Sequence, residues 1–262
     1  MTDTPAAPTA APFPVLCDLD GVVWLSHQPI DGSVDAVARL RAGGHRVLFV
    51  TNNSASRIGE QEATLEAIGI PAKGDVLSSA NAAALLVRAG ERVMVCGGPG
   101  IVEAITARGA IVAEDGPYDV VMVGFHRTFD YAEMTRSSAA VRGGARLIGT
   151  NDDATYPTPD GPIPGGGSIL AGIATASEIA PIVAGKPYAP MASLVRTITG
   201  LDDLRDAVMV GDRPDTDGRF ATTLGCRYAQ VWSGVTAAGT AVQPAPWIEG
   251  VNLAAIADQL LG

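Results

Sequence analysis

Two aspartates at the end of an apolar segment are the residues of this chain best placed to do chemistry. Asp18 and Asp20 lie in the run VLCDLDG, residues 15–21, in which a buried-strand pattern gives way to a glycine. Ligands of open α/β sheets bind beyond the carboxyl ends of the strands. We therefore interpret one carboxylate as a nucleophile or metal ligand and the other as an acid or base; a turn of the Asx type is the purely structural alternative.

Two more predicted strand ends carry polar residues that suit an anionic ligand. Thr51, Asn52 and Asn53 follow the apolar run VLFV and precede a predicted helix. A hydroxyl, two amides and the N–H groups of a helix terminus can hold a phosphate or an oxyanion, although a plain helix cap would use the same residues. Lys186 follows the run at 181–184, where it could balance a negative charge or be a solvated surface lysine.

The last strand end is acidic. Asp212, Asp215 and Asp217 fall within six residues after the run VMVG. Such carboxylates repel one another unless a cation or a proton intervenes. Hard oxygen ligands without a neighbouring Cys or His favour Mg²⁺ over zinc.

Strand and helix patterns alternate along most of the chain, which predicts an α/β fold with parallel sheets. The acidic and polar strand ends lie toward the two ends of the chain, whereas the middle forms a βα block of its own. We predict a disordered tail at 1–12, a core domain from 13–80 and 183–262, and an inserted α/β cap domain at 81–182. The strand candidates are 13–17, 46–50, 92–96, 119–123, 145–149, 181–184, 207–210 and 227–231.

Composition narrows the classes of partner. The 262 residues carry a formal net charge of −10, which argues against nucleic acid and anionic membranes as partners. No apolar stretch approaches the roughly 20 residues of a membrane span. The three cysteines are widely spaced, and we interpret them as buried reduced thiols of a cytoplasmic protein. The three histidines are too scattered for a metal site or a catalytic triad.

The four motifs together resemble a known family. Their order, D-x-D-G, T-N-N-S, G-K-P and G-D-x-x-x-T-D, is similar to that of the haloacid dehalogenase superfamily. The long insert between the second and third motifs resembles the large-cap branch of NagD-like, p-nitrophenylphosphatase-like and phosphoglycolate phosphatase-like enzymes. The runs 150–157 and 164–168 also look like that branch. The resemblance implies a Rossmann-like core with an α/β cap.

The resemblance also implies roles for the acidic residues. Asp18 would attack phosphorus and become an aspartyl-phosphate. Asp20 would protonate the leaving alkoxide and then deprotonate the hydrolytic water, which a raised pKa favours. A Mg²⁺ ion would be held by Asp18, the backbone carbonyl of Asp20 and Asp212, with Asp217 orienting a bound water.

The remaining motif residues would bind the substrate. By the same resemblance, Thr51, Asn52, Asn53 and Lys186 would neutralise the charge of the transferring phosphoryl group. The implied function is a Mg²⁺-dependent phosphatase of small phosphorylated metabolites, and two copies would pair through the cap. Open alternatives are a phosphotransferase or phosphomutase on the same scaffold and a non-catalytic binding module; a dehalogenase is disfavoured by Asp20 and the acidic cluster.

Two positions depart from the pattern of this branch. Gly218 replaces a branched apolar residue, which predicts a loosened helix start. His126 stands in the cap where relatives often carry aspartate. We expect His126 and the loop 151–157 to govern the choice of substrate, and the sequence does not name that substrate.

Overall fold

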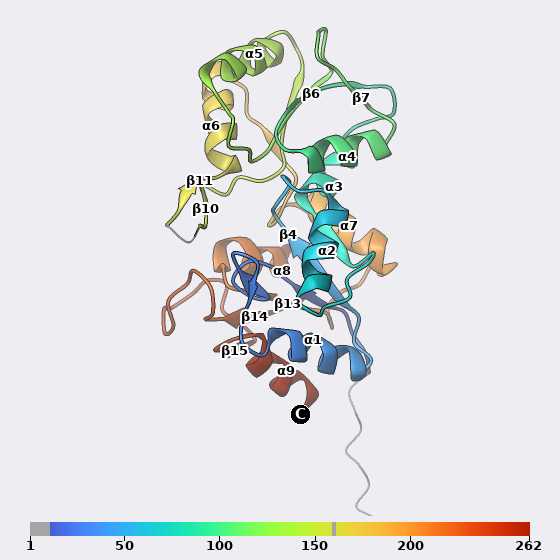
Figure 1. The fold of residues 1–262 in the computed structure, drawn as a ribbon, viewed down its shortest axis with the longest axis vertical. Helices are drawn as coiled ribbons and strands as arrows, with labels where there is room; N and C mark the ends of the chain where they lie inside the picture. The colour runs from blue at the N-terminus through green and yellow to red at the C-terminus, as the bar shows by residue number, and fades with distance from the viewer. Residues whose placement is uncertain (1–10, 159–160) are drawn as a thin grey trace, which may run out of the picture.

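The computed structural model describes residues 11–158 and 161–262, so the predicted tail at 1–12 falls almost wholly outside the described part. Two parallel sheets dominate these residues, one at each end of the elongated molecule (Figure 1). The predicted α/β fold is confirmed. Among the described helices, none combines the length and the hydrophobicity needed to cross a bilayer.

The larger sheet has six parallel strands in the order β15-β14-β13-β1-β4-β5. Strand β1 is central, since Cys17 pairs with Phe49 of β4 on one side and Val210 of β13 on the other. The strands are β1 (Val15–Cys17), β4 (Val47–Thr51), β5 (Val76–Ser78), β13 (Val208–Gly211), β14 (Arg227–Val231) and β15 (Ile248–Gly250).

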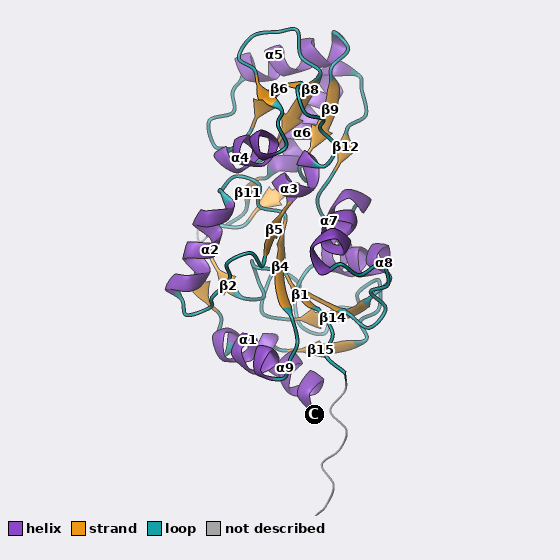
Figure 2. Ribbon diagram, turned by 90° about the vertical axis from the view of Figure 1, so that its right-hand side faces the viewer, coloured by secondary structure: helices purple, strands orange, loops and turns teal. Residues whose placement is uncertain are grey.

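Helices cover both faces of this sheet (Figure 2). Because side chains alternate along a strand, Val15 and Cys17 pack toward one face and Leu16 toward the other. The first face carries α1 (Ser33–Ala42), α2 (Ile58–Ala67) and α9 (Leu253–Leu261). The second carries α3 (Ser79–Ala84), α7 (Ala189–Thr199) and α8 (Arg219–Leu224). The sheet is therefore buried on both sides, as its continuous apolar runs predict.

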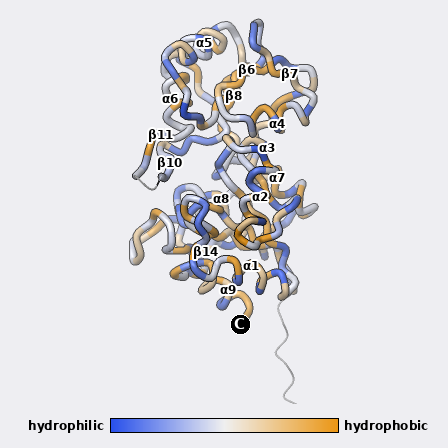
Figure 3. The backbone as a smooth tube through the Cα atoms, in the orientation of Figure 1, coloured by the Kyte–Doolittle hydropathy of each residue, from blue (hydrophilic) through white to orange (hydrophobic). Residues whose placement is uncertain are grey.

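The smaller sheet has five parallel strands in the order β12-β9-β8-β6-β7. These are β6 (Arg92–Cys96), β7 (Ile111–Val112), β8 (Val120–Val123), β9 (Arg146–Gly149) and β12 (Ile182–Val183). Helix α4 (Pro99–Ala107) covers one face, and α5 (Tyr131–Arg142) and α6 (Gly166–Ser177) cover the other. Figure 3 shows hydrophobic colouring along the inner strands, including β6.

A single hydrophobic cluster connects the two sheets through α3 and α4. It contains Leu48 of the larger sheet and Val93 of the smaller one. The division of the chain into core and cap at 81–182 stays a prediction. We use "core" for the part built on the six-stranded sheet and "cap" for the part built on the five-stranded sheet.

The sequence patterns did not predict two short hairpins or the two-residue strand β7. They are β2 (Trp24–Leu25) with β3 (Gln28–Pro29), and β10 (Thr155–Tyr156) with β11 (Ile163–Pro164). Two-residue strands are too short to show an alternating pattern. The edge strands β5 and β15 were likewise not predicted.

The helix start at Gly218, which the sequence predicts to be loosened, is irregular. Residues Pro214–Gly218 form a wide π-type turn, and regular helix starts only at Arg219. A Cβ on Gly218 would lie 2.9 Å from Cδ of Pro244 and 3.1 Å from the Tyr228 ring. The glycine therefore permits a close approach between chain segments, which a branched residue would prevent.

Candidate active site

The acidic strand ends meet at the topological switch point of the core sheet. From β1 the chain proceeds to β4 and β5 on one side, and it later adds β13, β14 and β15 on the other. Asp18 follows β1 and Asp212 follows β13, and the Asp18 N–H donates to the Val210 carbonyl at 2.9 Å. Ligands of open α/β sheets bind at such a point.

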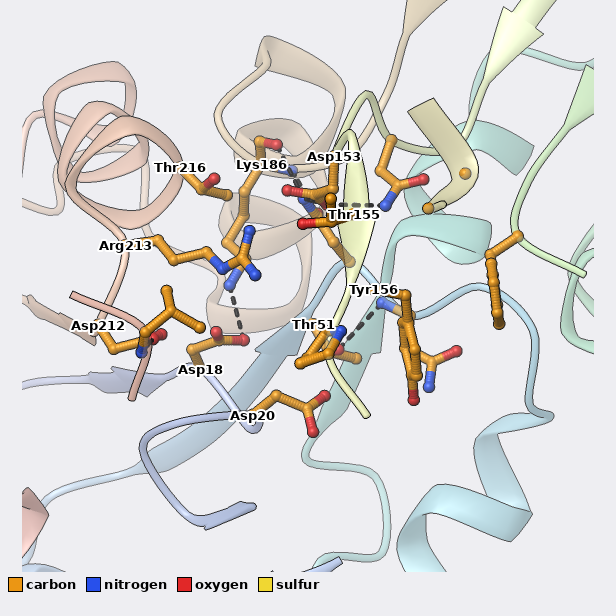
Figure 4. Close-up of a pocket in the computed structure, with 18 of the residues that line it drawn as sticks. Asp18, Asp20, Thr51, Asp153, Thr155, Tyr156, Lys186, Asp212, Arg213 and Thr216 are labelled. Atoms are coloured by element: carbon orange, nitrogen blue, oxygen red, sulfur yellow. Dashed lines mark hydrogen bonds and ion pairs between the residues drawn. The ribbon is translucent and has the colours of Figure 1, made fainter. Parts of the chain in front are cut away.

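A cavity of about 290 Å³ opens beyond these strand ends, between core and cap (Figure 4). Of the eight residues predicted for the site, seven line the cavity: Asp18, Asp20, Thr51, Asn52, Asn53, Lys186 and Asp212. The eighth, Asp217, lies behind Lys186 and is fully buried. Asp215 of the acidic cluster is exposed and faces away.

Lys186 joins the nucleophile candidate to the buried acid. Its Nζ lies 2.8 Å from Oδ1 of Asp18 and 2.7 Å from Oδ1 of Asp217. Burial opposes the charged amine, but the two carboxylates outweigh it and raise the pKa of Lys186. The ammonium is thus a permanent positive charge at 1% exposure, and the alternative of a solvated surface lysine is wrong.

Three carboxylates converge where a cation would bind. Oxygens of Asp18, Asp212 and Asp217 all lie within 4.8 Å of one another. Burial, followed by the charge of Asp18, raises the pKa of Asp212 to about 6. Burial likewise raises the pKa of Asp217 to about 7, against the opposing effect of Lys186. Three ionised carboxylates beside one ammonium leave two uncompensated negative charges, which a divalent cation would balance.

A hydrogen bond holds the Asp212 carboxylate in place but leaves one of its oxygens without a partner among the described residues. Its Oδ2 accepts a hydrogen bond of 2.7 Å from the Val235 N–H, whereas its buried Oδ1 has no hydrogen-bond partner among the described residues. A Cβ on Gly21 or Gly234 would lie 2.6 Å or 2.4 Å from Cγ of Asp212. These glycines make room for the carboxylate, and its free oxygen is the ligand that a hard cation needs.

Asp20 has the environment of a proton donor. Its Oδ1 accepts a hydrogen bond of 3.1 Å from Nε1 of Trp24, and a turn closed by the Gly21 N–H and the Trp24 carbonyl fixes its position. Burial, followed by the charge of Asp18, raises the pKa of Asp20 to about 6. Its carboxylate is not one of the three that converge, so any metal contact would come from its backbone carbonyl.

Asn52 is engaged by protein groups on every side. Its Oδ1 accepts from the Lys186 N–H at 2.8 Å, and its Nδ2 donates to the Lys186 carbonyl at 3.0 Å and to Oδ2 of Asp153 at 2.8 Å. Both amide hydrogens and the amide oxygen are therefore in use. This geometry gives the Asn52 side chain a positioning role, because it clamps Lys186 and the cap loop, and a contact between Asn52 and the phosphate stays a prediction.

Thr51 and Asn53 keep groups available to the cavity. Oγ1 of Thr51 accepts a hydrogen bond of 3.0 Å from the Asn53 N–H, which leaves its hydroxyl hydrogen to donate. Oδ1 of Asn53 accepts at 3.0 Å from the Ala55 N–H, which leaves its amide nitrogen as a donor. Both side chains can thus cap the helix region and still donate to an anion.

Several residues of the cavity were missed by sequence reasoning. Arg213 reaches into it from the turn after β13, and the Arg213 position within the fourth motif was the available signal (Figure 4). Phe125 and Tyr156 form a wall with their rings stacked at 4.7 Å and an angle of 9°. The cap loop 151–157 contributes to the lining as expected, whereas His126 does not line the cavity.

Comparison with known proteins agrees with the arrangement of the site. Residues 15–111 match the family model described as haloacid dehalogenase-like hydrolase. Residues 183–260 match a second family model, described as HAD-hydrolase-like. The gap between the two matches falls within the predicted cap.

Two relatives of similar sequence are named phosphatases. D-glycerol 3-phosphate phosphatase of Mycobacterium tuberculosis is 37% identical over 240 residues, which cover 88% of this chain and 66% of that protein. An acid sugar phosphatase of Staphylococcus saprophyticus is 33% identical over 84% of this chain and 86% of that protein. This chain thus spans just under two thirds of the mycobacterial protein and most of the staphylococcal one.

Two solved structures share the fold closely. The p-nitrophenyl phosphatase of Archaeoglobus fulgidus superimposes with a TM-score of 0.88 at 27% identity, covering 94% of this chain and 98% of that one. The mycobacterial glycerol phosphate phosphatase in complex with magnesium gives a TM-score of 0.85 at 33% identity, covering 95% and 78%. The chain therefore belongs to the haloacid dehalogenase-like hydrolases, as its four motifs had indicated.

Proposed function

We propose that this chain is a Mg²⁺-dependent phosphatase that hydrolyses small phosphate monoesters through a phosphorylated Asp18. One observation carries the proposal: at the switch point, Lys186 bridges Asp18 and Asp217 while Asp20 and Asp212 line the same cavity. A nucleophile, a proton donor, a cation-binding set and a fixed positive charge are thus within reach of one phosphate group. The phosphatase relatives support the same reaction class.

The metal set fits Mg²⁺. Its donors are carboxylate oxygens, and the free Oδ1 of Asp212 lacks any other partner among the described residues. Asp18, Asp212 and the backbone carbonyl of Asp20 would hold the ion, with Asp217 acting through a water because its oxygens already accept from Lys186 and the Arg213 N–H. When bound, the ion supplies positive charge beside the phosphoryl oxygens.

The chain's own groups then perform two transfers. An Asp18 oxygen bonds to phosphorus as the bond to the leaving oxygen breaks, and Asp20 gives its proton to that oxygen. Asp20, now a carboxylate, takes a proton from water, whose oxygen bonds to phosphorus and releases phosphate and the Asp18 carboxylate. Lys186, the Thr51 hydroxyl and the Asn53 amide balance the charge of the phosphoryl group in both steps.

The cavity indicates a small leaving group. Its volume of about 290 Å³ combines an aromatic wall, Phe125 and Tyr156, with polar groups of Asp153 and Arg213. A hydroxylated or aromatic leaving group of a few carbons fits this lining. We infer a phosphorylated polyol, sugar or related metabolite, in line with the names of the relatives.

The cap and the association of two chains complete the proposal. Residues 81–182 would form the cap domain that closes over the core, and two copies would pair through their caps. Exposed Ile111 and Val112 on the edge strand β7 offer an apolar, unpaired edge for such pairing. Light scattering coupled to size exclusion tests the pairing, and the I111K variant should separate a dimer into monomers.

A phosphate-release screen over some dozens of phosphorylated metabolites tests the function. Free phosphate, Mg²⁺ dependence and a strong preference among the esters would support it. Transfer of the phosphoryl group to an added alcohol without free phosphate would instead show a phosphotransferase or phosphomutase. Turnover of none of the esters, with intact fold and added Mg²⁺, would favour the binding module.

A further inference from the structure

A second cluster of reactive side chains lies in the cap, outside the catalytic cavity. Cys96, His126 and Glu133 each bring one ligand atom to within 4.8 Å of the others. Nε2 of His126 lies 3.7 Å from Sγ of Cys96 and 3.5 Å from Oε2 of Glu133. None of the three lines the catalytic cavity, and the proposed reaction uses none of them.

The cluster occupies the switch point of the cap sheet. The chain leaves β6 for β7 on one side and then returns to β8, β9 and β12 on the other. Cys96 ends β6, His126 follows β8, and Glu133 lies in the first turn of α5 above them. Ligands of open α/β sheets bind at such a point, so the topology makes this position suitable for a bound ion.

Two of the three separations in the cluster match those of ligands around a tetrahedral zinc ion. With Zn–S of about 2.3 Å and Zn–N and Zn–O of about 2.0–2.2 Å, tetrahedral angles place S and N about 3.6 Å apart and N and O about 3.4 Å apart. The observed separations are 3.7 Å and 3.5 Å. Both separations that involve Nε2 of His126 are thus within about 0.1 Å of the tetrahedral values, and the sulfur and the carboxylate oxygen lie within 4.8 Å of each other.

Neighbouring residues orient the ligands. Nδ1 of His126 lies 3.1 Å from Oγ1 of Thr128, and donation of the Nδ1 proton to Thr128 leaves the Nε2 lone pair directed at the cluster. The buried Ser137 hydroxyl, one turn after Glu133 on α5, has no hydrogen-bond partner among the described residues. Side chains of His126 and Glu133 are 13% and 17% exposed, which gives an ion a route from solvent.

We propose that Cys96, His126 and Glu133 form a zinc site, with a water in the fourth position. Thiolate and imidazole ligands select zinc, whereas the all-oxygen set of the core suits Mg²⁺. On binding, the Cys96 thiol releases its proton to solvent and its sulfur bonds to the ion. The ion ties the end of β6 to α5 and to the loop that carries Phe125, the neighbour of His126, into the catalytic cavity.

The test is a Co²⁺ titration of the metal-free full-length protein, followed by displacement with Zn²⁺. We expect one equivalent of Co²⁺ to give the near-ultraviolet thiolate-to-cobalt band and the intense visible bands of tetrahedral cobalt, and Zn²⁺ to remove them. The C96S variant should lose the thiolate band. The matched control C226S, which changes a partly buried cysteine elsewhere, should keep it, as should D212A, which disables the core set.

Two milder variants guard against a folding failure of C96S. E133Q changes a partly exposed ligand, and T128V changes a residue that contacts the ligand His126. Each variant should bind Zn²⁺ about 10- to 100-fold more weakly, measured in competition with a chromophoric chelator. Zn²⁺ should raise the melting temperature of the wild type more than that of E133Q. Two results would overturn the proposal. One is a wild type without the thiolate-to-cobalt band, which would mean that a shared proton, and not a metal ion, links the three side chains. The other is an unchanged Zn²⁺ affinity of the E133Q variant.

Discussion

The core and the cap are both parallel sheets with a switch point, yet they gather different donors there. In the core, the ends of β1 and β13 bring together Asp18 and Asp212, with Lys186 beside them. In the cap, the ends of β6 and β8 bring together Cys96 and His126. The same topology thus offers hard oxygens in one half of the molecule and soft sulfur and nitrogen in the other.

Topology thus supplies the place for a site, whereas side-chain chemistry supplies its function. The three core carboxylates carry more negative charge than Lys186 balances. They lie at a cavity of about 290 Å³ that residues of the cap also line. The cap set lies outside that cavity. We therefore assign the reaction to the core and a supporting role to the cap.

Asp18→Asn should cause the largest loss, on the order of 10⁴-fold or more in kcat, because an amide is a poor nucleophile and a poor ligand for a cation. Steady-state turnover of p-nitrophenyl phosphate measures it. Beryllofluoride should be bound by the wild type and not by the variant. Retention of more than about one per cent of the rate would place the nucleophile elsewhere.

Asp212→Ala should make activity depend on much higher Mg²⁺, with a loss on the order of 10²- to 10³-fold at a fixed moderate concentration, since charge stabilisation of the phosphoryl group is reduced. A Mg²⁺ titration of the rate measures the shift. Calcium, which accepts more ligands in looser geometry, should inhibit the wild type. Full wild-type activity in excess chelator would contradict the assignment of the metal to the core.

Asp20→Asn should slow an alkyl phosphate by about 10²- to 10⁴-fold and p-nitrophenyl phosphate much less, because only the strongly basic alkoxide needs a proton to leave. With the pKa of Asp20 raised to about 6, its protonated fraction falls as the pH rises through that value. The wild-type rate on the alkyl ester should fall on that alkaline side, and the variant should lack this dependence. Equal losses on both esters would make Asp20 structural.

Cap substitutions should have the smallest and most uneven effects. Tyr156→Ala and Asp153→Ala remove an aromatic wall and a polar group of the cavity, and each should change kcat/KM by about 10- to 200-fold for some esters and little for others. A panel of phosphate esters measures the spread. One common factor for every ester would mean that the loop governs closure, and the division between core and cap would be wrong.

Much of the fold could be predicted from local sequence patterns. Buried strands such as Val47–Thr51 are continuous apolar runs, and the helices between them have local start and stop signals. Gly218 predicted a loosened start of α8, but not the wide turn itself, because the contact of Gly218 with Pro244 and Tyr228 joins segments distant in sequence. The short hairpins were likewise set by their neighbours and not by their own residues.

Local sequence was enough to identify the family and to predict the site residues, since each strand-end motif is a short stretch of chain. The surroundings of these residues depend on how distant segments pack. The packing of the cap on the core brings Asp153 to Asn52 across 101 positions, and strand order within the cap sheet brings His126 to Cys96 across 30. Burial likewise sets the charges, because desolvation depends on the whole packed environment and raises the pKa of Asp20 to about 6.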